Sequence, residues 1–287
     1  MNRICAGVVL YEPDIELLRQ NVTAISSQVQ AVIVVDNASS NADAARGVFE
    51  AEFVTWVSNA SNVGIAKALN QVMDEAAQLG FDWVVTLDQD SVSDASMVAN
   101  MMPAMADDVI MVAPRVIDKA FADTGAAGDQ LPDFEDIDRC ITSGALTQVA
   151  AVKAIGGFDE RLFVDQVDNE ICLRAGERGY RVVQANRALL YQRYGENGVR
   201  RRFLWRMVSY HEYSPDRVYY QQRNLIYVCR KYGKRYVPHP MFFALVRQPA
   251  AFFVKLLFMP GQRLLRLKKF RRGFVDGWRL STKVFGG

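Results

Sequence analysis

Two acidic residues, Asp88 and Asp90, have the types and spacing best suited to chemistry in this sequence. They end an apolar run, residues 83–91, that reads WVVTLDQDS. Residues i and i+2 at the end of an extended segment project to one side, so both carboxylates can converge on one cation. Mg²⁺ and Mn²⁺ need few protein carboxylates when phosphates supply the other ligands. The pair therefore predicts a divalent-metal site for a phosphorylated ligand, or, alternatively, an acidic turn after a strand.

The segments around this pair predict alternating strands and helices. Apolar runs predict strands at residues 4–10, 31–35, 53–57, 83–87 and 109–113. Helices are predicted from a cap at Asp14 to about Ser26, from a cap at Asn62 to Gly80, and near residues 94–105. This order predicts an α/β fold, a Rossmann-like and mostly parallel sheet with helices on both faces.

Polar residues follow each of the first four predicted strands. They are Tyr11-Glu12-Pro13, Asp36-Asn37, Asn62-Val63-Gly64 and Asp88-Gln89-Asp90. Turn formation or helix capping could explain each group alone. In parallel sheets, however, ligands bind beyond the carboxyl ends of the strands, and four such groups at one edge favour a nucleotide-type ligand. The sequence has no G-x-x-x-x-G-K-[ST] loop and no G-x-G-x-x-G after the first strand, which argues against a P-loop or dinucleotide fold.

Charge is divided unevenly along the chain. Residues 1–192 carry 13 basic and 28 acidic side chains, whereas residues 193–287 carry 21 basic and 4 acidic ones. The basic final third indicates an anionic partner, either a membrane surface or a nucleic acid. In residues 263–279 apolar and aromatic residues recur every three or four positions among basic ones, which predicts an amphipathic helix at an anionic membrane. The alternative is a helix packed on the protein's own acidic body, and aromatic anchors favour lipid over nucleic acid.

The lack of a signal-peptide pattern at the start of the sequence indicates a cytosolic protein. The four cysteines, Cys5, Cys140, Cys172 and Cys229, form no C-x-x-C pair, so neither a disulfide framework nor a zinc site is expected. The first nine residues lack the pattern of a signal peptide. No window reaches the roughly 18 uninterrupted apolar residues of a spanning helix. Residues 241–259 come nearest, with polar or proline interruptions at residues 247–249 and 255.

Four segments resemble, in order and spacing, the family 2 inverting glycosyltransferases of GT-A fold. They are VVDNASSN, SNVGIAKALNQ, LDQDS and GGFDERLFVDQVDNEICLRAGERGY. The resemblance covers residues 4–232, and LDQDS together with R-x-Y-Y-x-x-R-N at residues 217–224 resembles the bacterial rhamnosyltransferase branch. It implies transfer of L-rhamnose from dTDP-L-rhamnose, with inversion, to a polyprenyl-diphosphate-linked saccharide in cell-surface polysaccharide synthesis. The implied domains are a GT-A glycosyltransferase domain at residues 1–235 and C-terminal amphipathic helices for membrane association at residues 236–287.

The resemblance also assigns roles to individual residues. Asp88 and Asp90 would hold the ribose and a diphosphate bound to Mg²⁺ or Mn²⁺, and Asp168 occupies the position of the catalytic base. Asp165 is the alternative base, since the spacing predicts that it shares a helical face with Asp168. Relatives commonly have histidine where this chain has Gln192, whose amide oxygen is a third candidate metal ligand. The expected donor-binding residues are Tyr11, Asp36, Asn37, Asn62, Gly64, Lys67, Asp88, Gln89, Arg217 and Arg223.

Gly156-Gly157-Phe158-Asp159 is expected to be the turn that presents the acceptor face, or else a helix stop. His211, one of two histidines, could reach the acceptor or lie on the surface. The expected partners are a nucleotide-sugar donor, a lipid-linked saccharide acceptor and an anionic membrane surface, with no nucleic acid. The sequence does not decide whether the protein forms a homo-oligomer.

A peripheral location on the cytoplasmic face of the bacterial inner membrane is expected. Three other functions are weighed: a transferase that uses a UDP-linked sugar, a non-catalytic membrane-binding relative, and a sugar nucleotidyltransferase. The nucleotidyltransferase is disfavoured because the sequence lacks a glycine-rich, arginine-containing loop after the first strand.

Overall fold

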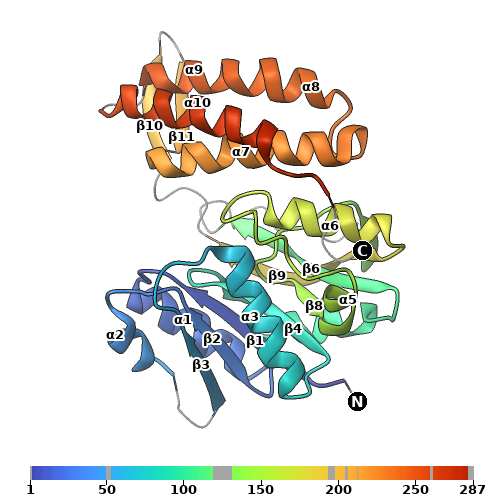
Figure 1. Ribbon diagram of the computed structural model, residues 1–287. Coiled ribbons are helices and arrows are strands. Elements are labelled where there is room, and N and C mark those ends of the chain that lie inside the picture. Colours follow the sequence, from blue (N-terminus) through green and yellow to red (C-terminus); the bar gives the residue numbers. More distant parts are fainter. Residues whose placement is uncertain are drawn as a thin grey trace. The chain divides into compact units, whose positions relative to one another are not determined.

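In a computed structural model, the chain divides into two units (Figure 1). The structure describes residues 2–49, 53–118, 131–192, 198–203, 206–211, 213–258 and 261–283. Unit 1 comprises Met1–Phe163 and Val167–Arg193, and unit 2 comprises Val164–Gln166 and Tyr194–Gly287. Three residues that interrupt unit 1 along the chain therefore belong to unit 2.

Unit 1 is built on a nine-stranded sheet with the order β3-β2-β1-β4-β8-β6-β9-β5, in which β7 also pairs with β9. Four strands run parallel to one another: β1 (Ile4–Leu10), β2 (Val32–Asp36), β3 (Val54–Ser58) and β4 (Trp83–Asp88). The parallel sheet predicted from the sequence is confirmed for these strands.

Beyond β4 the sheet is mixed. β8 (Leu146–Gln148) is antiparallel to both β4 and β6 (Val109–Asp118), and β9 (Arg181–Gln192) is parallel to β6. β5 (Val92–Ser93) and β7 (Phe134–Ile137) pair antiparallel with β9. A short strand, β8, thus separates β4 from the next long strand.

The central strand β1 is buried along its whole length, as expected for a parallel strand covered on both faces. Its register pairs Leu10 with Asp36 of β2 and Val9 with Asp88 of β4. The carboxyl ends of these three strands are therefore level with one another. We call this edge of the sheet the rim.

Helices cover both faces of the sheet of unit 1 (Figure 1). α1 (Ile15–Ser26) and α4 (Met97–Met101) contribute side chains to one buried cluster with β1, β2 and β4. α3 (Ile65–Gln78) lies on the other face, where a Cβ on Gly7 of β1 would come 2.3 Å from Cγ1 of Val72. The remaining helices of unit 1 are α2 (Ala42–Arg46), the 3₁₀ turn η2 (Met102–Ala104), α5 (Val149–Ala154) and α6 (Val167–Glu177).

The predicted N-cap residue of α1 is confirmed, whereas that of α3 is wrong. The Asp14 carboxylate accepts hydrogen bonds from the N–H groups of Glu16 and Leu17, which confirms the predicted start of α1. The predicted cap of α3 at Asn62 is wrong, because α3 begins at Ile65 and its N-cap residue is Gly64, with a φ of 84°. Asn62 instead accepts a hydrogen bond from the N–H of Gly64 in a turn before the helix.

Unit 2 contains an antiparallel hairpin and a set of helices. The hairpin is β10 (Gly198–Phe203) and β11 (Arg206–His211), and α7 (Pro215–Tyr232) follows, capped by the Ser214 hydroxyl. The chain continues through η5 (Gly233–Arg235), α8 (Pro240–Phe242), the π-helical η6 (Phe243–Arg247), α9 (Gln248–Phe258) and α10 (Arg263–Arg279). Pro249 has no N–H to donate to the preceding turn, which gives a physical reason for the π-helical segment before it.

α10 lies between α7 and α9 (Figure 1). Glycines allow its close approach to α7, because a Cβ would come 2.4 Å from the Tyr219 carbonyl oxygen at Gly273 and 2.7 Å from that of Arg223 at Gly277. On the α9 side, the rings of Phe252 and Phe270 stack with their centroids 4.3 Å apart. By its contacts, α7 thus belongs with the C-terminal helices, whereas the functional division at residues 235 and 236 stays a prediction.

Candidate active site

The structure brings together several residues that the sequence predicts as a site. Tyr11 follows β1, Asp36 ends β2 and Asp88 ends β4, all at the rim. Asn37 continues from β2, and its N–H donates to the Leu10 carbonyl over 2.9 Å. These side chains therefore share one edge of the sheet, as the parallel arrangement requires.

Hydrogen bonds tie the loop after β1 to the loop after β2. The Glu12 carboxylate accepts from the Ser40 hydroxyl (2.7 Å) and N–H (2.8 Å), and these bonds hold the pKa of Glu12 below its usual range. The N–H of Glu12 donates to the Ser39 hydroxyl over 3.0 Å. Both loops contain a non-glycine residue in the left-handed region, Glu12 (φ 49°) and Ala38 (φ 64°). The turn-forming composition was the only sequence signal for this connection.

A chain of side-chain amides lines the rim next to β2. Asn37 is buried, and its Oδ1 accepts a hydrogen bond from Nδ2 of Asn59 (2.9 Å). Asn59 and Gln71 of α3 exchange two further hydrogen bonds. The neighbouring Asp36 is also buried and accepts from the N–H of Ser39. Fixed amide and carboxylate groups of this kind can read the polar edge of a nucleobase or a ribose.

The predicted acidic pair lies at the end of β4. Asp88 and Asp90 are both exposed, whereas Gln89 between them exchanges two hydrogen bonds with the backbone of Tyr11. The Nε2 of Gln192 donates to the Ser91 hydroxyl over 2.8 Å, although the two residues are 101 apart in the sequence. The third predicted metal ligand thus lies beside the segment that carries the two carboxylates.

This donor set fits a cation that shares its coordination with phosphate. Among the described residues, no group of three or more His, Cys, Asp or Glu side chains could hold a metal ion. Two carboxylates and one amide oxygen suit Mg²⁺ or Mn²⁺ only when a ligand completes the shell, which a diphosphate does. The residues therefore fit an ion that binds together with its substrate.

Asp168 lies in the first turn of α6, and its Oδ1 accepts a hydrogen bond from the Asn169 N–H (2.8 Å). Shortly before it, the Phe163 carbonyl accepts from the N–H of Ile65 at the start of α3 (2.8 Å). Gly64 is needed for this contact, because a Cβ there would come 2.5 Å from the same oxygen. The contact joins the predicted donor-binding segment at Gly64 to the chain that leads into Asp168.

A buried ion pair in α6 supports the predicted acceptor turn. Arg174 makes two hydrogen bonds to the Glu170 carboxylate and also donates to the carbonyls of Ile155 (2.6 Å) and Gly157 (2.7 Å). Gly156 and Gly157 have positive φ angles of 93° and 74°. From α3, Asn70 exchanges two hydrogen bonds with the backbone of Phe158. In the sequence, only the i, i+4 spacing of Glu170 and Arg174 indicates this arrangement.

The family model described as Glycosyl transferase family 2 matches residues 8–148, a range that contains the rim residues from Tyr11 to Asp90. This chain is a glycosyltransferase, and its sequence matches family 2. A relative named dTDP-rhamnosyl transferase RfbF, from Shigella flexneri, is 26% identical to it over 246 residues, which are 80% of this chain and 81% of the relative.

Two solved structures resemble the transferase in fold. One is the mannosyltransferase PcManGT from Pyrobaculum calidifontis in complex with GDP-Man and Mn²⁺, with a TM-score of 0.60, 16% identity, and coverage of 96% of this chain and 86% of that one. The other is GalNAc-T7 with UDP, GalNAc and Mn²⁺, with a TM-score of 0.64, 10% identity, and coverage of 96% and 56%. These likenesses confirm the predicted GT-A fold of the transferase.

One predicted feature of the transferase is wrong: Asp165 and Asp168 do not share a helical face. α6 begins at Val167, and Asp165 and Gln166 have φ angles of 63° and 68°, which lie outside the helical region. Asp165 instead pairs with Arg217 (3.3 Å), a contact within unit 2.

Two predicted donor-binding arginines have contacts within unit 2. The guanidinium of Arg217 lies 5.0 Å from the ring centroid of Tyr213, and that of Arg223 lies 4.8 Å from the ring of Tyr220. Their role in donor binding stays a prediction, as does that of Lys67, which is exposed near the start of α3. The side chain of His211 lies outside the described residues.

Two cysteines of the transferase that are distant in sequence come together near Asp168. The sulfur atoms of Cys140 and Cys172 lie 4.0 Å apart. The hydrogen bond with Cys172, burial, and the negative charges of Cys172 and Asp168 raise the pKa of Cys140 well above its usual range. No sequence pattern indicates this pair, because its members are separated along the chain and packing alone joins them.

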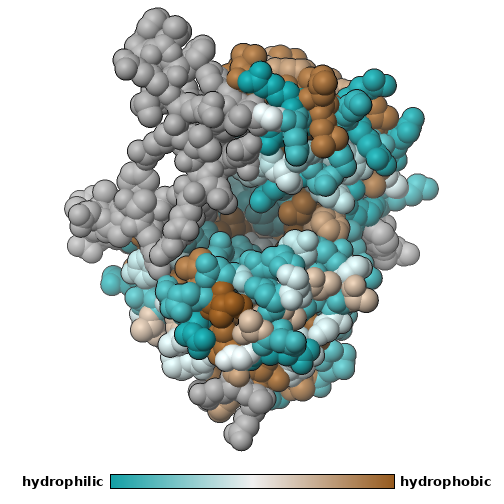
Figure 2. Space-filling view, turned by 90° about the vertical axis from the view of Figure 1, so that its left-hand side faces the viewer, coloured by the Kyte–Doolittle hydropathy of each residue, from teal (hydrophilic) through white to brown (hydrophobic). Residues whose placement is uncertain are grey.

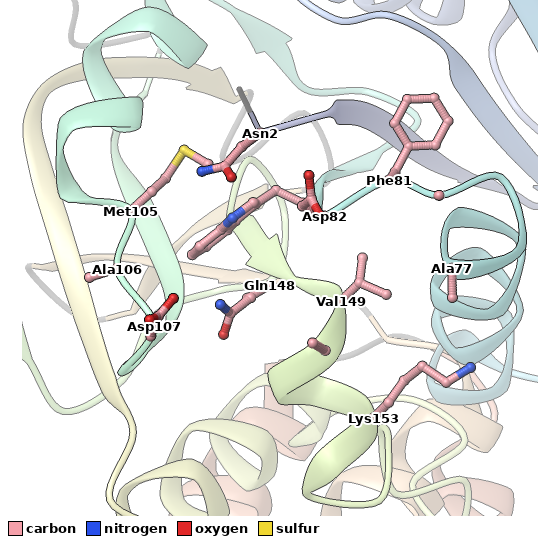
Figure 3. A pocket seen from close by; sticks show the side chains of 13 residues that line it. Asn2, Ala77, Phe81, Asp82, Met105, Ala106, Asp107, Gln148, Val149 and Lys153 are labelled. Atoms are coloured by element: carbon pink, nitrogen blue, oxygen red, sulfur yellow. The ribbon is translucent and has the colours of Figure 1, made fainter.

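A separate cavity of about 550 Å³ opens at the other end of the sheet (Figure 3). Its lining includes Asn2, Asp82 and Asp107, which precede β1, β4 and β6, together with Lys153 of α5. Asp82 accepts a hydrogen bond from the Arg3 N–H, and Lys153 pairs with Asp74. Because the rim residues follow the strands whereas these residues precede them, the cavity is not part of the candidate active site.

Proposed function

We propose that the transferase moves L-rhamnose from dTDP-L-rhamnose to a hydroxyl of a polyprenyl-diphosphate-linked saccharide in bacterial cell-surface polysaccharide synthesis, with inversion of the anomeric configuration. The similarity to the dTDP-rhamnosyl transferase RfbF over 80% of the chain carries this proposal. A rim with buried Asp36 and Asn37 next to exposed Asp88 and Asp90 supports a nucleoside diphosphate sugar as the donor.

The chemistry needs a base for the acceptor and a stabilised leaving group. The Asp168 carboxylate takes the proton of the acceptor hydroxyl, whose oxygen forms the new bond to the anomeric carbon. The bond from that carbon to the diphosphate breaks on the opposite face, so a single displacement inverts the configuration. A divalent ion at Asp88, Asp90 and Gln192, Mg²⁺ or Mn²⁺, would supply positive charge to the departing diphosphate. Asp36 and Asn37 bind the nucleoside.

A donor panel tests the identity of the sugar nucleotide. The purified transferase is incubated with dTDP-L-rhamnose and with several UDP-sugars, and the released nucleoside diphosphate is measured. We expect dTDP release from dTDP-L-rhamnose alone. Equal or faster hydrolysis of a UDP-sugar would instead establish the alternative donor class.

An exchange of Asp168 for asparagine tests the base. Asp168→Asn should abolish transfer, because the amide cannot accept the proton, while donor binding stays close to that of the wild type. The matched control is Asp107→Asn, the same change at the far end of the sheet. Activity of Asp168→Asn within a few fold of the control shows that the base lies elsewhere, and Asp165 is then the next candidate.

The metal proposal has a readout that does not depend on turnover. In calorimetry, Asp90→Ala should bind dTDP more weakly than the wild type when Mn²⁺ is present. Without Mn²⁺ the wild type itself binds dTDP more weakly, and there the two proteins should bind it equally. Asp107→Ala again serves as the control. If Mn²⁺ strengthens dTDP binding equally in Asp90→Ala and in the control, Asp90 is not a metal ligand.

We also propose that unit 2 attaches the transferase to the cytoplasmic face of the bacterial inner membrane. Within the described residues, one helical stretch, Pro240–Leu257, has the length and composition to cross a membrane, and only 11% of it is buried. Among the large apolar residues whose burial the structure describes, Leu257 (69%) and Leu264 (76%) are the most exposed. Figure 2 shows hydrophobic residues (brown) beside hydrophilic ones (teal) at the top of the view, where Figure 1 draws the helices of this unit.

Several contacts favour a helix that lies on the membrane over one that crosses it. Ala244 and Leu256 are buried, and Phe252 stacks on Phe270 of α10. Arg247 and Lys255 also interrupt the apolar stretch. A helix with one packed side and one apolar side among basic residues belongs at an anionic interface.

Flotation with liposomes tests the attachment. Leu257→Ser together with Leu264→Ser should reduce binding to vesicles that contain anionic lipid, and Leu79→Ser, which changes an exposed leucine of unit 1, should not. Binding that is equal in all three proteins, or the absence of binding by the wild type, overturns the proposal.

A further inference from the structure

The loop that leads into Asp168 has an unfavourable backbone conformation. Asp165 and Gln166 are consecutive non-glycine residues with φ angles of 63° and 68°. The left-handed region is disfavoured for such residues because Cβ approaches the following carbonyl oxygen. Two in succession persist only when surrounding contacts hold them.

A buried asparagine of α7 makes those contacts. The side chain of Asn224 is 0% exposed, and its Nδ2 donates to the carbonyls of Val164 (2.6 Å) and Asp165 (3.0 Å). Its Oδ1 accepts a hydrogen bond from Nε of Arg223 (2.8 Å), which fixes the orientation of the amide. One side chain thus holds two successive peptide groups of the loop.

Two further contacts from unit 2 hold the side chains of the same loop. The Tyr236 hydroxyl donates to Oε1 of Gln166 (2.9 Å), and Arg217 pairs with Asp165 (3.3 Å). All these contacts lie within unit 2, to which Val164–Gln166 belongs.

The two residues that flank the loop belong to unit 1. The Phe163 carbonyl before it is bound by the N–H of Ile65, and Val167 after it is buried and begins α6. The φ and ψ angles of residues 164–166 therefore determine how the chain enters α6. Asp168 lies in the first turn of this helix, so a change in the loop would move its carboxylate.

We propose that Asn224 is a positioning residue for the transfer reaction. By holding Asp165 and Gln166 in the left-handed conformation, it sets the start of α6 and the position of the Asp168 carboxylate. This inference rests on the proposed role of Asp168 as the base. It makes α7 part of the machinery that prepares the base, in addition to any role of unit 2 at a membrane.

Two substitutions of Asn224 test the proposal. Asn224→Ala removes the amide, and Asn224→Asp keeps its shape but removes both N–H donors. We expect each to lower kcat about a hundredfold, the order expected for a base displaced by about 1 Å, with the KM for the donor nearly unchanged. The control is Asn186→Ala, which removes a buried amide that donates to the Pro132 carbonyl in unit 1 and should leave kcat unchanged.

A glycine rescue separates positioning from general destabilisation. Glycine adopts the left-handed conformation without the Cβ conflict, so Gln166→Gly in the Asn224→Ala background should recover about tenfold in kcat. Hydrogen exchange should be faster across residues 163–170 in Asn224→Ala than in the wild type and return toward the wild-type rate in the rescued protein. Equal losses in kcat and in the folded fraction, without rescue, would show a purely structural role and overturn the proposal.

A milder variant and a parallel measurement of Asp168→Asn complete the test. If the Asn224 variants do not fold, Tyr236→Phe removes only the hydroxyl that binds Gln166 and should lower kcat a few fold at constant KM. Asp168→Asn is measured beside every variant. An inactive Asp168→Asn with a wild-type kcat in the Asn224 or Tyr236 variants overturns only the positioning role, whereas an active Asp168→Asn overturns the base assignment itself.

Discussion

Replacement of Arg174 by methionine should destabilise unit 1 severely. Its side chain is 6% exposed and makes a two-point ion pair with Glu170, whose side chain is 0% exposed. The same guanidinium satisfies the carbonyls of Ile155 and Gly157. Methionine can fill much of the volume but can donate no hydrogen bond, so the Glu170 carboxylate would stay buried without this partner.

The expected loss follows from the two kinds of bond removed. Removing one partner of a buried ion pair typically costs about 3 to 5 kcal/mol. The two carbonyls that lose a charged donor place the expected loss in the upper half of that range, about 4 kcal/mol. For a unit of this size about 2 to 4 °C accompanies each kcal/mol, so the melting temperature of unit 1 should fall by about 10 °C.

Thermal and urea unfolding measured by circular dichroism would give the loss, and hydrogen exchange of α6 would localise it. The control Lys153→Met breaks an exposed ion pair with Asp74 and should cost at most about 1 kcal/mol. The double variant Glu170→Leu with Arg174→Met should be more stable than Arg174→Met alone, because no carboxylate remains buried. A loss for Arg174→Met no larger than that of Lys153→Met would refute this reasoning.

Three further outcomes are expected. Gly64→Ala should destabilise unit 1 by about 2 kcal/mol and weaken dTDP binding, because φ is 84° and the new Cβ would displace Phe163. Thermal melting and calorimetry measure the two effects. The control is Gly176→Ala, where a Cβ meets no other described atom within 4 Å. Gln192→His should lower the Mn²⁺ concentration needed for half-maximal activity, because imidazole binds Mn²⁺ better than an amide does, and an unchanged requirement would place the metal elsewhere. Burial raises the pKa of Cys5 and Cys229 to about 12, so at pH 8 to 9 both should stay protonated and resist thiol reagents until the protein unfolds; rapid labelling of either in the folded protein would contradict this.

Local sequence signals predicted the parts of the fold that depend on neighbouring residues. The start of α1 follows from the Asp14 carboxylate, and the strand ends follow from apolar runs that stop at polar residues. The position of Asp88 at one rim with Asp36 and Asn37 was predictable because parallel strands place their carboxyl ends on one edge of a sheet. The metal site was predicted from the spacing of Asp88 and Asp90, whereas the ribose and base roles came from family resemblance. All three remain predictions.

Contacts between distant segments account for the failures. Asn62 does not cap α3, because the chain turns at Gly64 to meet Phe163. Asp165 is not helical, because Asn224, about sixty residues away, holds the loop before α6. A periodicity argument considers only residues along one element, so it cannot detect a side chain from another element that competes for the same backbone.

The glycine contacts between α10 and α7 bear on how shortened forms of this enzyme should be interpreted. Gly273 and Gly277 lie against backbone atoms of α7, the helix that carries Asn224. Removing α10 would expose this side of α7 to water. If the truncated enzyme loses activity, it would resemble an enzyme that needs lipid for activity. In a soluble, truncated enzyme, loss of a membrane anchor and loss of the helix that packs on α7 would thus occur together. Substitutions at exposed positions such as Leu257 and Leu264 separate the two effects, because they leave the α7–α10 contact intact.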